Sequence, residues 1–262
     1  MRSDLDNAFN SPPLEVPPDL RIVAVLPALN EAASIGMVVS RLLRQSAVPV
    51  SAVIVVDNGS TDGTGDLARA HGATVVREEH RGYGSACYAG LMAAANADVI
   101  VLLDADAADD LNDLARILEP IIWNEADLVV GSRALGSTEP GAMTWQQVAG
   151  NRLTCALIQR IYHRSVTDLG PFRAIRRRDL LRLNMSEMTY GWSTEMVVKV
   201  ARASYRYREV PVRYHRRIGD SKVGGTFWGS LRAGRSMLLT TLRYARWSPS
   251  AANADTHAEV TS

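Results

Sequence analysis

The fold of this chain is decided by one stretch, Val99-Ile100-Val101-Leu102-Leu103-Asp104-Ala105-Asp106. Five apolar residues in a row are typical of a strand that is buried on both faces, as in a parallel sheet. The two acids that follow would lie at the carboxyl edge of the sheet, where open α/β folds bind ligands. Carboxylate oxygens are the preferred ligands of hard divalent cations. The stretch therefore predicts a cation site, although two solvated acids that open a turn would give the same pattern.

Apolar runs and helix-like segments alternate along the rest of the chain. Strands are expected at 22–26, 53–56, 74–76, 127–133 and 205–214, with helices between most of them. Such alternation indicates βαβ units and a mostly parallel sheet. We therefore expect an α/β fold in which helices flank a mostly parallel sheet.

Composition sets the expected boundaries of the folded part. Residues 1–20 contain two Pro-Pro pairs and no periodicity, so they are expected to be a disordered or loosely draped tail. Residues 248–262 are small and polar and are expected to be a disordered tail. One domain is expected over 21–226, with a loop at 134–144. An amphipathic helix is expected over 227–247.

Charge is spread unevenly along the chain. The formal net charge is only +1, but residues 152–246 contain 18 arginines and two lysines against six acids, a local excess of +14. Such a segment favours anionic partners: phosphates, nucleic acid or an acidic membrane surface. The two cysteines, Cys87 and Cys155, lack metal-ligand spacing, which indicates a reduced compartment. The sequence predicts neither a signal peptide nor a membrane-spanning helix.

Three common α/β chemistries lack their motifs here. The first expected strand is followed by Pro-Ala-Leu-Asn-Glu at 27–31 rather than by a glycine-rich dinucleotide turn. The sequence contains no P-loop and no Ser-His-acid order around a nucleophile elbow.

The loops suit a nucleoside diphosphate instead. Asp57 can accept hydrogen bonds from a base or ribose, and Asp104 and Asp106 can hold a metal against the phosphates. The basic residues that can neutralise phosphate charge are Arg133, Arg216 and Lys222.

Five motifs, taken together and in order, resemble the inverting glycosyltransferases of family 2, and within them the dolichyl- or polyprenyl-phosphate mannose synthase branch. The matching segments are 27–31, 56–64, 104–106, 168–173 and 216–222. The resemblance implies the GT-A fold, which is a Rossmann-like, mixed but mostly parallel sheet in a single domain.

The resemblance also implies roles for single residues. The nucleoside would be held by Pro27, Leu29, Glu31 and Asp57; Mg²⁺ or Mn²⁺ by Asp104 and Asp106; and the phosphates by Arg133, Arg216, Ser221 and Lys222. Two positions depart from the family pattern. Ala108 stands where the synthases have a glutamine, which makes Asp109 the nearby candidate for that part of the metal site. Tyr83 stands where many relatives have a lysine.

The implied reaction is direct displacement at the anomeric carbon of the sugar, with a nucleoside diphosphate leaving. A hydroxyl acceptor needs a general base, whereas a phosphate acceptor is already an anion and needs positive charge for positioning. The basic segment 152–246 therefore favours a phosphate acceptor over a neutral hydroxyl, and the resemblance implies that this phosphate is a polyprenyl phosphate. The catalytic candidates are Asp106, Arg133 and Glu195, and Glu195 could equally be a helix N-terminal acid stabilised by the helix dipole.

The last expected helix also bears on the acceptor. Its apolar stripe with arginines beside it is typical of an anionic membrane interface, or of an ordinary core-packing helix. The residues of this pattern are Phe227, Trp228, Leu231, Leu238, Leu239 and Leu242, with Arg232, Arg235, Arg243 and Arg246. We expect peripheral association with the inner, cytoplasmic face of the membrane and a donor of the GDP-mannose or UDP-glucose type, with no nucleic acid partner. Two alternatives stay open: a soluble transferase for a small phosphorylated or hydroxylated metabolite, and a non-catalytic nucleotide- or membrane-binding relative.

Overall fold

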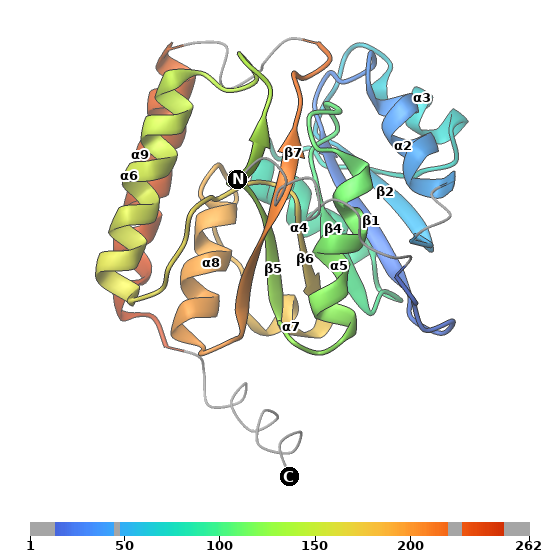
Figure 1. Cartoon of the computed structure of the whole chain (residues 1–262). Helices are drawn as coiled ribbons and strands as arrows, with labels where there is room; N and C mark the ends of the chain where they lie inside the picture. Colours follow the sequence, from blue (N-terminus) through green and yellow to red (C-terminus); the bar gives the residue numbers. More distant parts are fainter. Residues whose placement is uncertain (1–13, 45–47, 220–226, 249–262) are drawn as a thin grey trace.

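The computed structural model describes residues 14–44, 48–219 and 227–248, and of residues 227–232 it describes the backbone alone. One mixed sheet of seven strands forms the centre (Figure 1). In chain order the strands are β1 (Ile22–Ala28), β2 (Ala52–Asp57), β3 (Thr74–Arg77), β4 (Val99–Leu102), β5 (Leu128–Thr138), β6 (Arg173–Arg176) and β7 (Tyr207–Tyr214).

The order of the strands across the sheet is β3-β2-β1-β4-β6-β5-β7. All neighbours are parallel except at β6, which runs antiparallel to both β4 and β5. The carboxyl ends of β1, β2 and β4 therefore meet at one edge. The expected α/β fold with a mixed, mostly parallel sheet is confirmed.

Helices cover both faces of the sheet. They are α2 (Ile35–Arg44), α3 (Thr64–Ala70), α4 (Tyr83–Ala93), α5 (Leu114–Ile122), α6 (Trp145–Tyr162), α7 (Arg177–Arg182), α8 (Trp192–Arg202) and α9 (Phe227–Arg243), with short 3₁₀ turns at Leu111–Asp113 and Tyr244–Arg246. One apolar cluster joins the sheet to α2, α3 and α5, and a second joins the other face to α4, α6, α7 and α8. α9 lies beside α6 and also contacts α8 (Figure 1).

The central strand β4 forms as the apolar run predicts, since all four of its residues are buried. α2 has the matching amphipathic pattern, with Ile35, Val38, Val39 and Leu42 buried against the sheet. α6 begins at Trp145. A capping box explains this start, because Thr144 Oγ1 accepts from Gln147 N and Gln147 Oε1 accepts from Thr144 N.

Two irregular segments are fixed by tertiary contacts. Residues 14–20 end the tail that was expected to be disordered or loosely draped, and Leu14, Val16 and Leu20 pack against the apolar cluster of α2, α3 and α5. The loop expected at 134–144 is wrong in its first part. β5 continues through Thr138 into the expected loop at 134–144, because its end still pairs with the end of β7. In both cases a tertiary contact, rather than local sequence, fixes the conformation.

Candidate active site

Three loops at the carboxyl edge of the sheet are bound to one another through hydrogen bonds. The loop after β1 reaches the loop after β2, because Asn30 N donates to Ser60 Oγ (2.9 Å) and Glu31 N donates to Thr64 Oγ1 (2.8 Å). The same loop reaches the acid loop after β4, where Ser34 Oγ donates to the Ala105 carbonyl (2.8 Å). These bonds join the segments that carry the predicted nucleoside-binding and metal-binding residues.

The predicted nucleoside-binding residues lie together on two adjacent strand ends. Asp57 is the last residue of β2 and pairs in register with Ala28 at the end of β1. Its Oδ1 accepts from Ser60 N at 2.8 Å, which fixes the carboxylate. Pro27, Leu29 and Glu31 are half-buried at or just after the end of β1. A polar and an apolar surface are thus available side by side, as a base and ribose require.

The predicted metal ligands follow β4 in a tight turn. Asp106 is 3% exposed, and its Oδ1 accepts from Ala108 N at 3.0 Å. Ala107 between them has φ +63°, the left-handed region that L-residues rarely adopt. Asp106 Oδ2 lies 3.3 Å from Arg217 Nη2. The turn therefore holds the second acid in one orientation.

A third carboxylate, that of Asp109, joins Asp104 and Asp106. Burial raises the pKa of Asp109 well above its ordinary value, and the charges of Asp104 and Asp106 raise it further. Burial and Asp106 likewise raise the pKa of Asp104, against the opposite effects of Arg217 and Arg133. Asp109 Oδ2 is buried and, among the described residues, has no hydrogen-bond partner. Like charges in a low-dielectric site repel one another, so a cation bound by one or two of these acids would relieve the repulsion.

The three acids influence one another's charge but do not form a complete metal-binding cluster. Within residues 14–44, 48–219 and 227–248, no three carboxylate, imidazole or thiolate groups surround a common point. Asp104 and Asp106 thus stay predicted ligands, with Asp109 as the neighbour that has an unused oxygen. Mg²⁺ commonly needs only one or two protein carboxylates and completes its shell with water and phosphate oxygens.

Arg133 is held at this edge by a buried acid. Asp168 accepts from Arg133 Nε and Nη2, each at 2.7 Å, and also from Arg133 N. Although burial opposes its charge, Asp168 raises the pKa of Arg133. Asp168 N in turn donates to Glu209 Oε1 at 3.0 Å. The guanidinium is also 5.0 Å from the centre of the Tyr214 ring. Arg133 is thus fixed in place, and its charge influences Asp104 and Asp109.

The two neighbouring arginines after β7 point to different places. Arg216 is exposed, and its Nε donates to the Pro140 carbonyl at 2.7 Å, away from the acids. Arg217 instead contacts Asp106. The sequence predicted Arg216 as a phosphate ligand and gave Arg217 no role beyond its place in the matched segment 216–222. The predicted ligands Ser221 and Lys222 lie outside the described residues.

Glu195 is not brought to the acid loop. It is fully buried in the first turn of α8, where Lys199 Nζ lies 2.7 Å from its Oε1. Its carboxylate also accepts from Ser186 N and Glu187 N. Although burial opposes its charge, these donors lower the pKa of Glu195. This geometry fits the alternative role of a structural acid at a helix start and gives Glu195 no exposed oxygen to act as a base.

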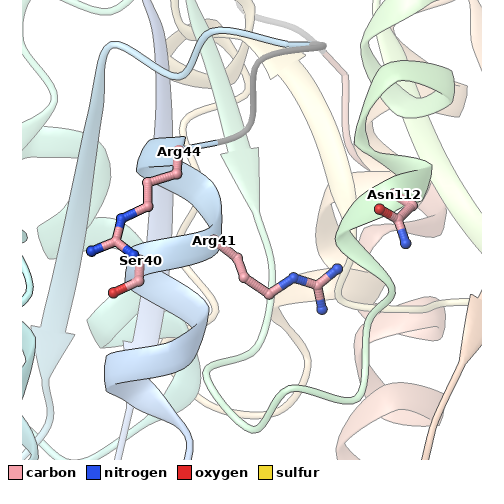
Figure 2. Close-up of a pocket in the computed structure, with 4 residues that line it drawn as sticks. All are labelled: Ser40, Arg41, Arg44 and Asn112. Carbon is pink, nitrogen blue, oxygen red and sulfur yellow. The ribbon is translucent and has the colours of Figure 1, made fainter.

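A hollow of about 270 Å³ lies between α2 and the 3₁₀ turn Leu111–Asp113, and none of the predicted site residues lines it (Figure 2). It is lined by Ser40, Arg41, Arg44 and Asn112. Figure 2 shows Arg41 extending from α2 toward Asn112. Arg41 Nη2 lies 3.8 Å from Asp110 Oδ1. This basic hollow is thus separate from the carboxylates that would hold a metal.

Three residues act on the site through others, and the sequence did not assign them these roles. Tyr83 contributes a hydrogen bond to Asp104, and Asp168 and Glu209 position Arg133. Asp168 lies within a matched motif, and Tyr83 stands out in the sequence as a departure from the family pattern. Glu209 carries no comparable signal, because its role depends on the packing of distant elements.

The chain is similar to known proteins across most of its length. Residues 23–183 match the family described as "Glycosyl transferase family 2". An uncharacterised glycosyltransferase of Mycobacterium tuberculosis is 36% identical over 216 residues, covering 81% of this chain and 94% of that protein. An undecaprenyl-phosphate mannosyltransferase of Micrococcus luteus is 33% identical over 230 residues, which cover 80% of this chain and 90% of that protein.

The fold has a solved counterpart. Glucosyl-3-phosphoglycerate synthase from Mycobacterium tuberculosis, crystallised with Mn²⁺, UDP and phosphoglyceric acid, superposes with a TM-score of 0.69 at 22% identity. The superposition covers 95% of this chain and 84% of that one. The expected GT-A fold is confirmed. With its edge of acids and arginines and a family match that spans more than half its length, the chain belongs to glycosyl transferase family 2.

Proposed function

We propose that this enzyme is an inverting glycosyltransferase that moves a hexose from a nucleotide sugar to a polyprenyl phosphate at the membrane surface. The observation that carries the proposal is a set of crowded carboxylates, the half-buried Asp104 and the buried Asp106 and Asp109, with Arg133 and Arg217 beside them at one sheet edge. A diphosphate that leaves a sugar needs positive charge around its oxygens. Metal-binding acids beside fixed arginines can supply this charge.

The donor would bind across the strand ends of β1, β2 and β4. Pro27, Leu29, Glu31 and Asp57 would hold the nucleoside, and Asp104 and Asp106 would hold Mg²⁺ or Mn²⁺. The cation would neutralise charge that develops on the leaving diphosphate. Arg133, which Asp168 fixes, adds a second positive group that needs no rearrangement during the reaction. Arg216, Ser221 and Lys222 stay proposed phosphate ligands.

Two observations support a phosphate acceptor. Glu195, the only base candidate from the sequence, has its carboxylate occupied by Lys199 and backbone groups. A phosphate monoester needs no general base, because it is already a nucleophilic anion. The relative from Micrococcus luteus is named as an undecaprenyl-phosphate mannosyltransferase. These points favour a lipid phosphate and a donor of the GDP-mannose or UDP-glucose type.

The face formed by α6 and α9 supports peripheral association with the inner face of a membrane. Trp145 and Leu153 on α6 are 73% and 58% exposed, and Leu239 and Leu242 on α9 are 52% and 54% exposed. Exposed arginines lie on the same two helices, and neither helix contains an acid. Apolar side chains among arginines suit an anionic bilayer. None of the described helices is long and apolar enough to cross a membrane.

The membrane part can be tested with vesicles of phosphatidylglycerol and phosphatidylcholine. The full chain should float with these vesicles, and Leu239→Glu with Leu242→Glu should reduce the bound fraction at least fivefold. Met37, which is 43% exposed on α2, supplies the matched control, and Met37→Glu should bind as the wild type does. Equal binding of all three proteins would remove the α9 face from the proposal.

The reaction is tested by incubating the enzyme with Mn²⁺, a labelled nucleotide sugar and undecaprenyl phosphate. Label should move into the organic phase as a nucleoside diphosphate is released, and Asp106→Ala should abolish both signals. Label that appears only in a water-soluble product with a phosphorylated metabolite would favour the soluble transferase. Binding of nucleotide without release of diphosphate from any donor would favour the non-catalytic alternative.

A further inference from the structure

The carboxylate expected to hold the cation already has a cationic partner within the chain. Arg217 Nη2 lies 3.3 Å from Asp106 Oδ2, and the Asp106 side chain is only 4% exposed. Two backbone bonds fasten this part of the chain to the acid loop: His215 N donates to the Ala108 carbonyl, and Ile218 N donates to the Asp106 carbonyl. The guanidinium is therefore attached to the acid turn rather than meeting it by chance.

The other nearby arginine has a different partner. Arg133 is bound to Asp168 through both its Nε and its Nη2. Arg217 instead contacts the acid loop itself, through Asp106. Arg217 is thus a counter-charge of the predicted metal ligands, and Arg133 is mainly the counter-charge of Asp168.

A divalent cation and a guanidinium cannot both bind Asp106 Oδ2 without strong repulsion between them. In a buried site this repulsion is poorly screened. A diphosphate changes the balance, because its oxygens can bind the cation and the guanidinium at the same time. Arg217 would then exchange a carboxylate partner for a phosphate partner at little cost.

We infer that Arg217 competes with the divalent cation for Asp106 until a nucleoside diphosphate is present, so that cation and nucleotide bind cooperatively. The inference rests on the proposed function, because it takes Asp106 as a metal ligand and a diphosphate as part of the donor. Coupling of this kind is reciprocal: the nucleotide strengthens cation binding by the same factor as the cation strengthens nucleotide binding. The enzyme would then take up the cation together with its donor.

Direct Mn²⁺ binding to the full chain tests the inference. Free Mn²⁺ is measured from its electron paramagnetic resonance signal, without nucleotide and with saturating UDP or GDP. For the wild type, nucleotide should tighten Mn²⁺ binding at least tenfold. Arg217→Gln should bind Mn²⁺ alone about fivefold more tightly than the wild type and should lose most of the gain from nucleotide. Arg217→Lys, which keeps the charge, should retain weak binding of Mn²⁺ alone.

Arg208→Gln is the matched control, because Arg208 pairs with Glu125 at the surface rather than with the acid loop. It should bind Mn²⁺ alone as the wild type does. The inference is overturned if Arg217→Gln binds Mn²⁺ alone no more tightly than the wild type does, or if no protein in the set binds Mn²⁺. The transferase proposal is judged separately, by diphosphate release from nucleotide sugars, and it can stand if the competition is refuted.

Discussion

Asp168 accepts three hydrogen bonds from a single residue, Arg133: one from the backbone N–H and two from the guanidinium. The Asp168 side chain is 1% exposed and that of Arg133 is 13% exposed, so the pair is almost completely removed from water. Burial opposes the charge of Asp168, but Arg133 outweighs it and lowers the pKa of Asp168. The arginine that faces the acid loop is thus held by an inner ion pair.

Asp168→Asn should destabilise the protein by about 3 kcal/mol, because it leaves a buried guanidinium without its counter-charge. Transfer activity should fall at least tenfold in protein that is still folded. Urea unfolding and nucleoside diphosphate release give the two readouts. Arg208→Gln is the control, because the Arg208–Glu125 pair is about half exposed and should contribute less than about 1 kcal/mol. Similar losses in both variants would contradict the special role of the inner pair.

Glu195→Gln should cost about 3 kcal/mol at neutral pH, because Lys199 then stays buried without a carboxylate. Since the pKa of Glu195 is lowered below 4.5 in the folded state, its contribution is complete above pH 4.5 and is lost as the pH falls through the lowered value. The stability difference between wild type and variant should therefore shrink in acid. Thermal unfolding between pH 3 and 7 measures this. A fall in turnover of more than about a hundredfold at unchanged fold would instead indicate a general base.

Gly84→Ala should destabilise the protein by about 1–3 kcal/mol, because the added methyl group would overlap the Glu187 carbonyl oxygen and lie 2.7 Å from Met188 Cα. Gly150→Ala is the opposite case. Gly150 lies inside α6, where no described atom is within 4 Å of an added Cβ, so alanine should stabilise by about 0.5–1 kcal/mol through helix propensity. Chemical denaturation compares the two variants, and a loss of stability in both would show that the packing at Gly84 is not the cause.

Asp109→Asn should have two effects of opposite sign. In the presence of a chelator it should raise the melting temperature, because it removes one of three crowded negative charges. It should also weaken Mn²⁺ binding about tenfold if the unpartnered oxygen of Asp109 takes part in holding the cation. Asp110→Asn provides the contrast, because Asp110 pairs with Arg213 and His215. This variant should lower the melting temperature and leave Mn²⁺ affinity unchanged. Unchanged Mn²⁺ affinity in Asp109→Asn would exclude Asp109 as a ligand.

The same crowding predicts a pH dependence for the metal-free protein. Because the folded-state pKa of Asp104 and of Asp109 is raised, the folded state binds more protons than the unfolded chain above about pH 4. Stability should therefore fall as the pH rises from about 4 through the raised values. Mn²⁺ with a nucleotide should remove much of this fall, which differential scanning calorimetry can follow. A stability that stays flat over this range would show that the acids do not repel one another in the folded state.

Residues that follow a buried strand could be predicted from the sequence with good accuracy. The apolar run that ends at Leu103 placed Asp104 and Asp106 at the sheet edge, because few other structures bury such a run. The choice between Arg216 and Arg217 could not be predicted. Neighbouring residues on a loop point in different directions, and the backbone bonds of 215–218 to the acid turn decide which one meets Asp106. Glu195 was ambiguous for a similar reason, since its burial depends on how Lys199 and the preceding loop at 186–187 pack around it.

The reversed strand β6 has a consequence for the shape of the edge. Arg173, its first residue, is in register with Leu102 of β4 on one side and Val130 of β5 on the other. Neighbouring strands are about 4.8 Å apart, so β6 separates the strand of the acids from the strand of Arg133 by about 10 Å. β6 is in effect a spacer. Arg133 therefore acts on the acid loop across an intervening strand, whereas Arg217, from the loop after β7, meets Asp106 directly. The spacing that β6 sets thus gives the two arginines different reaches to the same acids.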